Sequence, residues 1–153
     1  MNAIELLTQD HEKVKKLFEE AQRTSDMTEK TKLFDQIDTE LAIHAEIEEA
    51  VFYPALEQHD ELKEMVAEAR EEHEQVEELL LEIEDLATEG TDFDGQLSTL
   101  KETVEHHVSE EEGEMFPKVR DVLAEDALER LGRELESAKG KNTTAGRDDL
   151  QMA

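Results

Sequence analysis

Histidine and glutamate recur in this chain at a spacing that places an imidazole and a carboxylate on one face of a helix. His44 precedes Glu48 by four residues, His107 precedes Glu111 by the same interval, and a proline follows each pair. Residues i and i+4 of an α-helix lie about one turn apart on the same side. Each pair therefore points two potential metal ligands at one place, which is how helical bundles build metal sites in their cores.

A second pattern precedes each pair. His11 and His73 lie in the segments 10–14 and 72–76, and both segments read acid, His, Glu, any residue, Val. These two histidines are 62 residues apart, and 63 residues separate the histidines of the two pairs above. The nearly constant interval indicates that one helix pair occurs twice, with approximate two-fold symmetry.

Apolar residues at steps of three and four indicate the helices that position these side chains. Each of the four histidines occupies a position in one of these apolar stripes, and heights counted from the turns agree within roughly 5 Å at about 1.5 Å per residue. We therefore predict an all-α fold, an up-down-up-down four-helix bundle with a short C-terminal helical extension, and a kink or helix end at Pro54. The predicted helices cover about residues 2–24, 28–57, 61–88 and 94–116.

The end of the chain has a different composition from the rest. Apolar residues continue from 117 to about 139, and from Gly140 onward the sequence is small, polar and without pattern. We therefore expect residues 1–139 to form the bundle with its extension, and residues 140–153 to form a flexible tail.

Composition excludes several classes of function. The formal charge of −27, from 43 acidic and 16 basic residues, disfavours nucleic acid and anionic membrane surfaces as partners. The chain has no cysteine, which excludes disulfides and thiolate ligands. No apolar run of ~18 residues and no leader-like segment occur, so a cytoplasmic location is the default expectation.

The carboxylates in the apolar stripes argue for metal. A single histidine in such a stripe is more often a core residue bonded to a neighbour, but here four coincide with two glutamates. Burying an unpaired carboxylate costs several kcal/mol or more, and no Lys or Arg occupies the stripes. Imidazole and carboxylate without thiolate suit iron, manganese or zinc, and this many donors exceeds what one tetrahedral zinc takes. We predict two metal ions held by His11, His44, Glu48, His73, His107 and Glu111.

The pattern of His and HxxxE on alternating helices, with FYP or FP after each HxxxE, resembles the hemerythrin-like (HHE cation-binding) domain over about residues 1–125. The resemblance implies a non-haem di-iron site, with manganese or zinc as alternatives and an oxo or hydroxo bridge between two iron ions. It assigns His11 and His44 to one iron, His73 and His107 to the other, and Glu48 and Glu111 as bridges.

One position departs from the family. Oxygen-carrying hemerythrins have a fifth histidine one turn after the third-helix histidine, and this chain has Glu77 there. Glu77 is either an additional ligand or a surface acid, and both readings disfavour simple oxygen carriage. His106 is expected to support the site indirectly or to lie on the surface, and Phe52 and Tyr53 to line the core or a pocket.

The expected function is to bind or react with a small molecule (O2, peroxide or NO) for sensing, scavenging or detoxification. Two alternatives stay open at this point: a di-iron oxidase or peroxidase-like enzyme, and an iron store or iron sensor. The expected partner is a small diatomic ligand or peroxide.

Overall fold

The computed structural model of the chain describes residues 1–89 and 92–152 and is helical throughout the bundle. Asn2 caps the first helix with a reciprocal pair of hydrogen bonds to Glu5, as its position in the sequence suggests. The elements are α1 (Ala3–Arg23), α2 (Met27–Ile47), the π-helical turn η1 (Glu48–Phe52), α3 (Tyr53–Leu56), α4 (Asp60–Glu89), α5 (Phe93–Glu110), the π-helical turn η2 (Glu111–Met115), α6 (Phe116–Val122) and α7 (Glu125–Met152).

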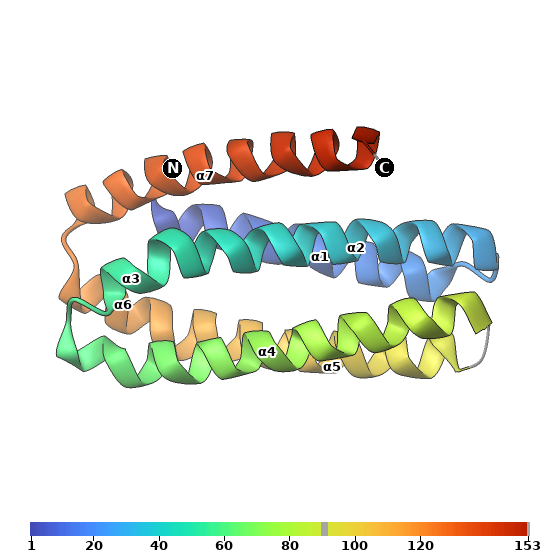
Figure 1. Cartoon of the computed structure of the whole chain (residues 1–153). Helices are drawn as coiled ribbons and strands as arrows, with labels where there is room; N and C mark the ends of the chain where they lie inside the picture. Colours follow the sequence, from blue (N-terminus) through green and yellow to red (C-terminus); the bar gives the residue numbers. More distant parts are fainter. Residues whose placement is uncertain (90–91, 153) are drawn as a thin grey trace.

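Four long rods form an up-down-up-down bundle, and a further helix covers one side of it (Figure 1). The α1–α2 hairpin packs beside the α4–α5 hairpin, and α7 lies along α1 and α2 on the side away from α4 and α5. This arrangement confirms the predicted fold class. None of the helices in the described part of the chain combines the length and the apolarity that crossing a bilayer requires.

The buried side chains form two clusters that sit at opposite ends of the bundle. One cluster contains Leu7, Phe52 and Val119, and the other contains Phe18 and Leu97. On every long helix the histidine or glutamate of the predicted site lies in sequence between members of the two clusters. The polar residues therefore form a layer between two apolar halves.

A π turn precedes each proline. Pro54 follows η1 as the second residue of α3, which ends two residues later at Leu56, so the rod ends close to Pro54, and a kink there stays a prediction. The Tyr53 N–H donates to the Glu48 carbonyl five residues back, and the Phe116 N–H donates to the Glu111 carbonyl in the same way. Each HxxxE pair thus ends at the first residue of a π turn, a feature that is frequent at functional sites.

The C-terminal part is helical beyond the expected boundary. A turn at residues 123–124 separates α6 from α7, and the backbone of α7 passes Gly140 without a break and continues to Met152. A helical backbone does not measure mobility, so the flexibility expected for residues 140–153 stays a prediction.

The docking of α7 gives a prediction for two of its glycines. A Cβ added to Gly132 would collide with the main chain of Met1 and Asn2, whereas one added to Gly140 would meet no heavy atom within 4 Å. We expect Gly132→Ala to cost about 1–3 kcal/mol through overpacking and Gly140→Ala to gain up to about 1 kcal/mol through helix propensity. Thermal denaturation measures both, and a Gly132→Ala variant as stable as Gly140→Ala would contradict this account of the docking.

Candidate metal centre

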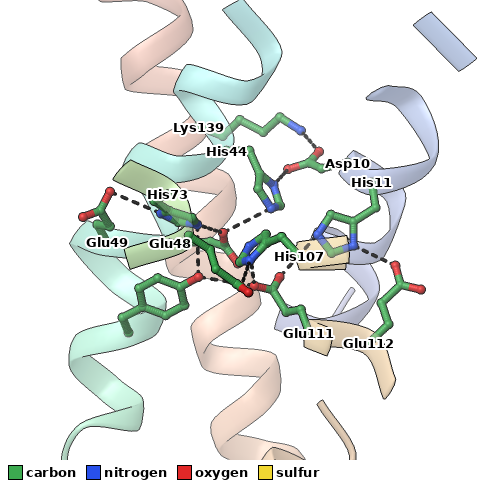
Figure 2. A network of polar contacts seen from close by, with 12 residues as sticks. Asp10, His11, His44, Glu48, Glu49, His73, His107, Glu111, Glu112 and Lys139 are labelled. Atoms are coloured by element: carbon green, nitrogen blue, oxygen red, sulfur yellow. Dashed lines mark hydrogen bonds and ion pairs between the residues drawn. The ribbon is translucent and has the colours of Figure 1, made fainter. Parts of the chain in front are cut away.

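The structure brings the six predicted residues together in one layer of the bundle (Figure 2). His11 comes from α1, His44 from α2, His73 from α4 and His107 from α5, and the two glutamates open η1 and η2. His11, His44, Glu48, His107 and Glu111 are buried, and the His73 side chain is 9% exposed. The predicted equality of heights along four separate rods therefore describes the molecule correctly.

The six side chains form two groups of three. The ligand atoms of His11, His44 and Glu111 lie within 4.8 Å of one another, as do those of Glu48, His73 and His107. Each group therefore contains two imidazoles and one carboxylate, which is a donor set that a transition metal can occupy.

Each glutamate faces both groups. Glu48 Oε1 lies 3.3 Å from His44 Nε2 and 3.1 Å from His73 Nε2. Glu111 reaches His11 Nε2 with Oε1 at 3.3 Å and His107 Nε2 with Oε2 at 3.2 Å. Both carboxylates thus stand between the groups, where a bridge between two cations would lie.

Several atoms of this layer have no hydrogen-bond partner although they are buried. They are His11 Nε2, His44 Nε2, His107 Nε2, Glu48 Oε2 and Glu111 Oε1. Leaving a buried polar group unpaired costs about 1–3 kcal/mol, and more for a charged one. Unpaired lone pairs that converge from four helices fit metal ions, because cations satisfy imidazole nitrogen and carboxylate oxygen together.

Nδ1 of each of the four central imidazoles contacts an acidic side chain, and Figure 2 labels three of these acids, Asp10, Glu49 and Glu112. Nδ1 of His11 lies 2.7 Å from Glu112, and Nδ1 of His44 lies 3.1 Å from Asp10. In the other half, the corresponding distances are 3.3 Å for His73 with Glu49 and 2.6 Å for His107 with Glu72. In the neutral form of each ring, Nδ1–H would donate to these carboxylates and Nε2 would carry the free lone pair towards the centre, an arrangement that orients metal-binding histidines.

These outer acids repeat with the internal symmetry of the chain. The acid before the first histidine of each half, Asp10 or Glu72, contacts the second histidine of the same half. The acid after each central glutamate, Glu49 or Glu112, contacts a histidine of the opposite half. The repeated acid-His and Glu-Glu dipeptides were the available sequence signal for these four residues, which the sequence prediction did not include.

Charge and burial together control protonation of the imidazoles. Burial disfavours the charged form of His44, but the Glu48 carboxylate and the hydrogen bond to Asp10 outweigh it and raise the pKa of His44 to about 10. For His107, burial is likewise outweighed, here by hydrogen bonds to Glu111 and Glu72, and the pKa rises to about 11. Without metal, both rings are therefore expected to be imidazolium ions at neutral pH, with a proton on each nitrogen.

Metal uptake near neutral pH is consequently expected to release the protons of His44 and His107, because a metal binds neutral imidazole. Metal affinity should fall as the pH is lowered. Calorimetric titration with Zn²⁺ in two buffers of different ionisation enthalpy measures the release. A binding heat that does not depend on the buffer would contradict it.

The same raised pKa values have the opposite effect on the stability of the metal-free protein, which should fall as the pH rises, whereas metal affinity should increase. A raised pKa in the folded state stabilises the protein fully below the unfolded value of about 6.5. This contribution is lost as the pH rises through about 10 for His44 and about 11 for His107. Thermal denaturation of the protein after treatment with a chelator should therefore show a melting temperature that declines as the pH rises from about 6.5 to about 11.

Tyr53 belongs to the centre as well as to the core. Its side chain is fully buried, its hydroxyl lies 3.1 Å from His73 Nε2, and it donates to Glu111 Oε2 at 3.3 Å. Burial, together with the negative charges of Glu48 and Glu111, raises the pKa of Tyr53, so the phenol stays protonated. The repeat places Phe116 at the equivalent position, where its ring stacks at 6.2 Å on His11. The surroundings of His73 and His11 therefore differ by one hydroxyl.

The remaining candidates lie outside the buried layer. Glu77 is exposed and belongs to none of the cation groups found in the described residues, which favours the surface-acid reading over the ligand reading. His106 is 68% exposed and contacts Glu110 at 3.0 Å. His59 lies half-buried in the bend before α4.

The all-α fold and the two facing His/Glu groups in its core place this protein in the class of helical bundles that bind metal between their helices. The family of the hemerythrin HHE cation-binding domain matches residues 2–119, and the chain belongs to this family. Family membership implies metal binding, with iron as the expected ion, and the His/Glu groups of the structure agree with it.

One solved structure and one relative carry the same family description. A crystal structure of a hemerythrin HHE cation-binding domain-containing protein from Mycobacterium kansasii is similar, with a TM-score of 0.86, 28% identity, and coverage of 99% of this chain and 93% of that one. The chain is 30% identical over 144 residues to a DNA nickase of Nostoc sp. strain PCC 7120, and 30% identical over 132 residues to an uncharacterised hemerythrin-like protein of Schizosaccharomyces pombe. These matches cover 92% and 85% of this chain but only 40% and 65% of the two relatives.

Proposed function

We propose that this layer binds two iron ions and that the di-iron centre binds or reacts with O2, peroxide or NO in sensing, scavenging or detoxification. The observation that carries the proposal is the pair of facing groups, each with two imidazoles and a shared carboxylate. His11 and His44 would hold one ion and His73 and His107 the other, with Glu48 and Glu111 between them. Two imidazoles and two bridging carboxylates leave coordination positions open on each ion.

The surroundings of the centre favour a small neutral ligand. A pocket with about 480 Å³ of empty space, including its mouth, is bounded by all four histidines. Its other walls are almost entirely aliphatic, and Asp10 is the one acid among them, where it is bonded to His44. The aliphatic lining residues are Val14, Leu41, Ala45, Val76, Val104 and Val108. A lining of this kind favours neutral molecules such as O2, NO and hydrogen peroxide over ions, because it offers a charge few polar partners.

Tyr53 favours chemistry over simple binding, and so supports the alternative of an oxidase or peroxidase-like enzyme. Bound iron would supply the redox step, as cofactors do in general. The chain would supply a proton donor, because the buried phenol lies beside His73 and hydrogen-bonds to Glu111. Because the hydroxyl lies beside His73 and Phe116 takes the equivalent place beside His11, the ion held by His73 and His107 would be the preferred place of reaction.

We do not extend to this chain the nicking of DNA that the name of the Nostoc protein states. That match covers 40% of the Nostoc protein, and a formal charge of −27 repels a phosphate backbone. We propose a small-molecule partner and neither a nucleic-acid nor a membrane partner.

The test is anaerobic reconstitution with Fe²⁺, followed by metal analysis and separate exposure to O2, hydrogen peroxide and NO. We expect two irons per chain and a change in the iron absorption spectrum with at least one of the three. A stable, reversible band would indicate carriage or sensing, and repeated turnover of peroxide would indicate the enzyme. A large gain in melting temperature with no response to any of the three would instead support an iron store or iron sensor.

A further inference from the structure

The two halves of the bundle differ on their outer faces at positions that the repeat makes equivalent. On the α4–α5 half, a pocket with about 290 Å³ of empty space, including its mouth, opens between α4, α5 and η2. Five of its lining residues are glutamates, Glu68, Glu72, Glu110, Glu111 and Glu114. The pocket reaches from the surface to the buried metal layer, since His107 and Glu111 also line it.

The equivalent face of the α1–α2 half is apolar. The repeat intervals of 62 and 63 residues pair Glu68 with Leu6, His106 with Ile43 and Glu110 with Ile47. Leu6, Ile43 and Ile47 belong to or pack against the core cluster that also contains Leu131 and Leu135 of α7. One face is thus closed by α7, while the other remains open and carries acids.

Three side chains at the open face form a third group with cation-binding geometry. His106 Nε2 lies 3.0 Å from Glu110 Oε1 and 4.0 Å from Glu72 Oε2, and one ligand atom of each residue lies within 4.8 Å of the others. Glu72 is partly buried, whereas His106 is mostly exposed. One imidazole and two carboxylates suit a divalent first-row cation that keeps several waters.

A second observation connects this group with the centre. His107 Nε2 and Glu111 Oε1 are unpartnered, both residues are more than nine-tenths buried, and both line the inner end of the same pocket. Glu72 connects the surface group with the buried centre. One of its oxygens accepts a hydrogen bond from His107 Nδ1 at 2.6 Å, and the other faces His106. A continuous path of carboxylates therefore leads from the surface to the vacant lone pairs.

We propose that Glu72, His106 and Glu110 form an auxiliary site for a divalent cation, and that metal reaches the buried centre through it. This inference rests on the proposed metal centre. The neighbouring Glu68 and Glu114 concentrate cations at the mouth, as clefts lined by one sign of charge do. Weak, hydrated binding at the surface would let the ion pass inward, where two imidazoles and the shared carboxylates would hold it more tightly.

The first experiment measures loading. The variant His106→Ala/Glu110→Gln is compared with His59→Ala/Glu102→Gln, which loses the same residue types outside the pocket and changes the charge equally. Stopped-flow uptake of limiting Fe²⁺ by the metal-free protein is expected to slow by about tenfold in the pocket variant, the lower end of what electrostatic focusing supplies. The final iron content should equal that of the control.

The second experiment counts ions. Electron paramagnetic resonance of Mn²⁺ added to the Zn²⁺-loaded protein should show one weakly bound Mn²⁺ that the pocket variant lacks and the control retains. Equal loading rates with equal Mn²⁺ counts would overturn the auxiliary site while leaving the centre intact. A lower final iron content at an unchanged rate would also overturn it, since these residues would then support the centre and not access to it. Failure of the wild type to bind iron at all would reject both proposals.

Discussion

Replacing His44 or His107 with alanine is expected to lower the iron content to about half or less of the wild-type value. Each variant removes one of the two imidazoles of its group. The ion of that group would then have only one imidazole and the shared glutamates as ligands. Because both carboxylates are shared, loss of one imidazole should also weaken the binding of the ion on the other side. Metal analysis after reconstitution and desalting measures the effect.

His59→Ala is the matched control for these variants. His59 lies in the bend before α4 and is absent from the cation groups of the described residues, so its loss should leave the iron content unchanged. Equal iron in all three variants would reject the assignment of ligands. Circular dichroism of each variant separates loss of metal from loss of fold.

Replacing Tyr53 with phenylalanine is expected to slow the reaction of the reduced protein with hydrogen peroxide by about 100-fold, within the range that a positioned proton donor contributes. The substitution removes the hydroxyl that lies 3.1 Å from His73 and donates to Glu111, and keeps the ring in its buried place. Stopped-flow absorption measures the rate, and iron content should stay at the wild-type level.

The dependence of this rate on pH distinguishes proton donation from packing. A variant that reacts as fast as the wild type at every pH would assign Tyr53 to the core alone. A slower rate that partly recovers as the pH is lowered would support the donor role, because solvent protons then replace the phenol.

Hydrophobic spacing predicted the helices and the common height of the four histidines well. The steps of three and four residues that lead through Ile4, Leu7, His11 and Val14 describe a single buried stripe, and all four residues are buried in α1. Because rise per residue is constant along a helix, counting from the turns was sufficient to place four histidines at one height. Fold class and site location therefore follow from local periodicity and chain length.

The π turns were the main local feature beyond such reasoning. On a regular α-helix, a residue lies about 140° around the axis from the residue five positions earlier, which would turn Tyr53 away from Glu48. In a π turn, the i→i+5 hydrogen bond stacks these positions, and the Tyr53 N–H bonds to the Glu48 carbonyl. A pattern of apolar residues cannot indicate one additional residue in a turn, so the phenol was assigned only to the core or a pocket.

The acids that contact the histidines could not be predicted from the sequence, because their contacts depend on how each helix is rotated about its axis. Glu112 contacts a histidine 101 positions away, and Lys139 bonds to Asp10 across 129 positions. Whether one glutamate or its neighbour reaches an imidazole depends on how the helices are rotated and packed against one another. The sequence contains many acids, and only tertiary packing selects among them.

The contact between Lys139 and Asp10 connects the C-terminal helix with His44, one of the proposed ligands (Figure 2). Asp10 shares its carboxylate between that ammonium group and His44, whereas Glu72, its counterpart, faces His106 and Glu110. Detaching α7 from the bundle would therefore weaken an ion held beside His44 more than one held beside His107. Metal affinity on the His11/His44 side would thus depend on the docking of the C-terminal helix, whereas on the His73/His107 side it would depend on the acids that face solvent around Glu72.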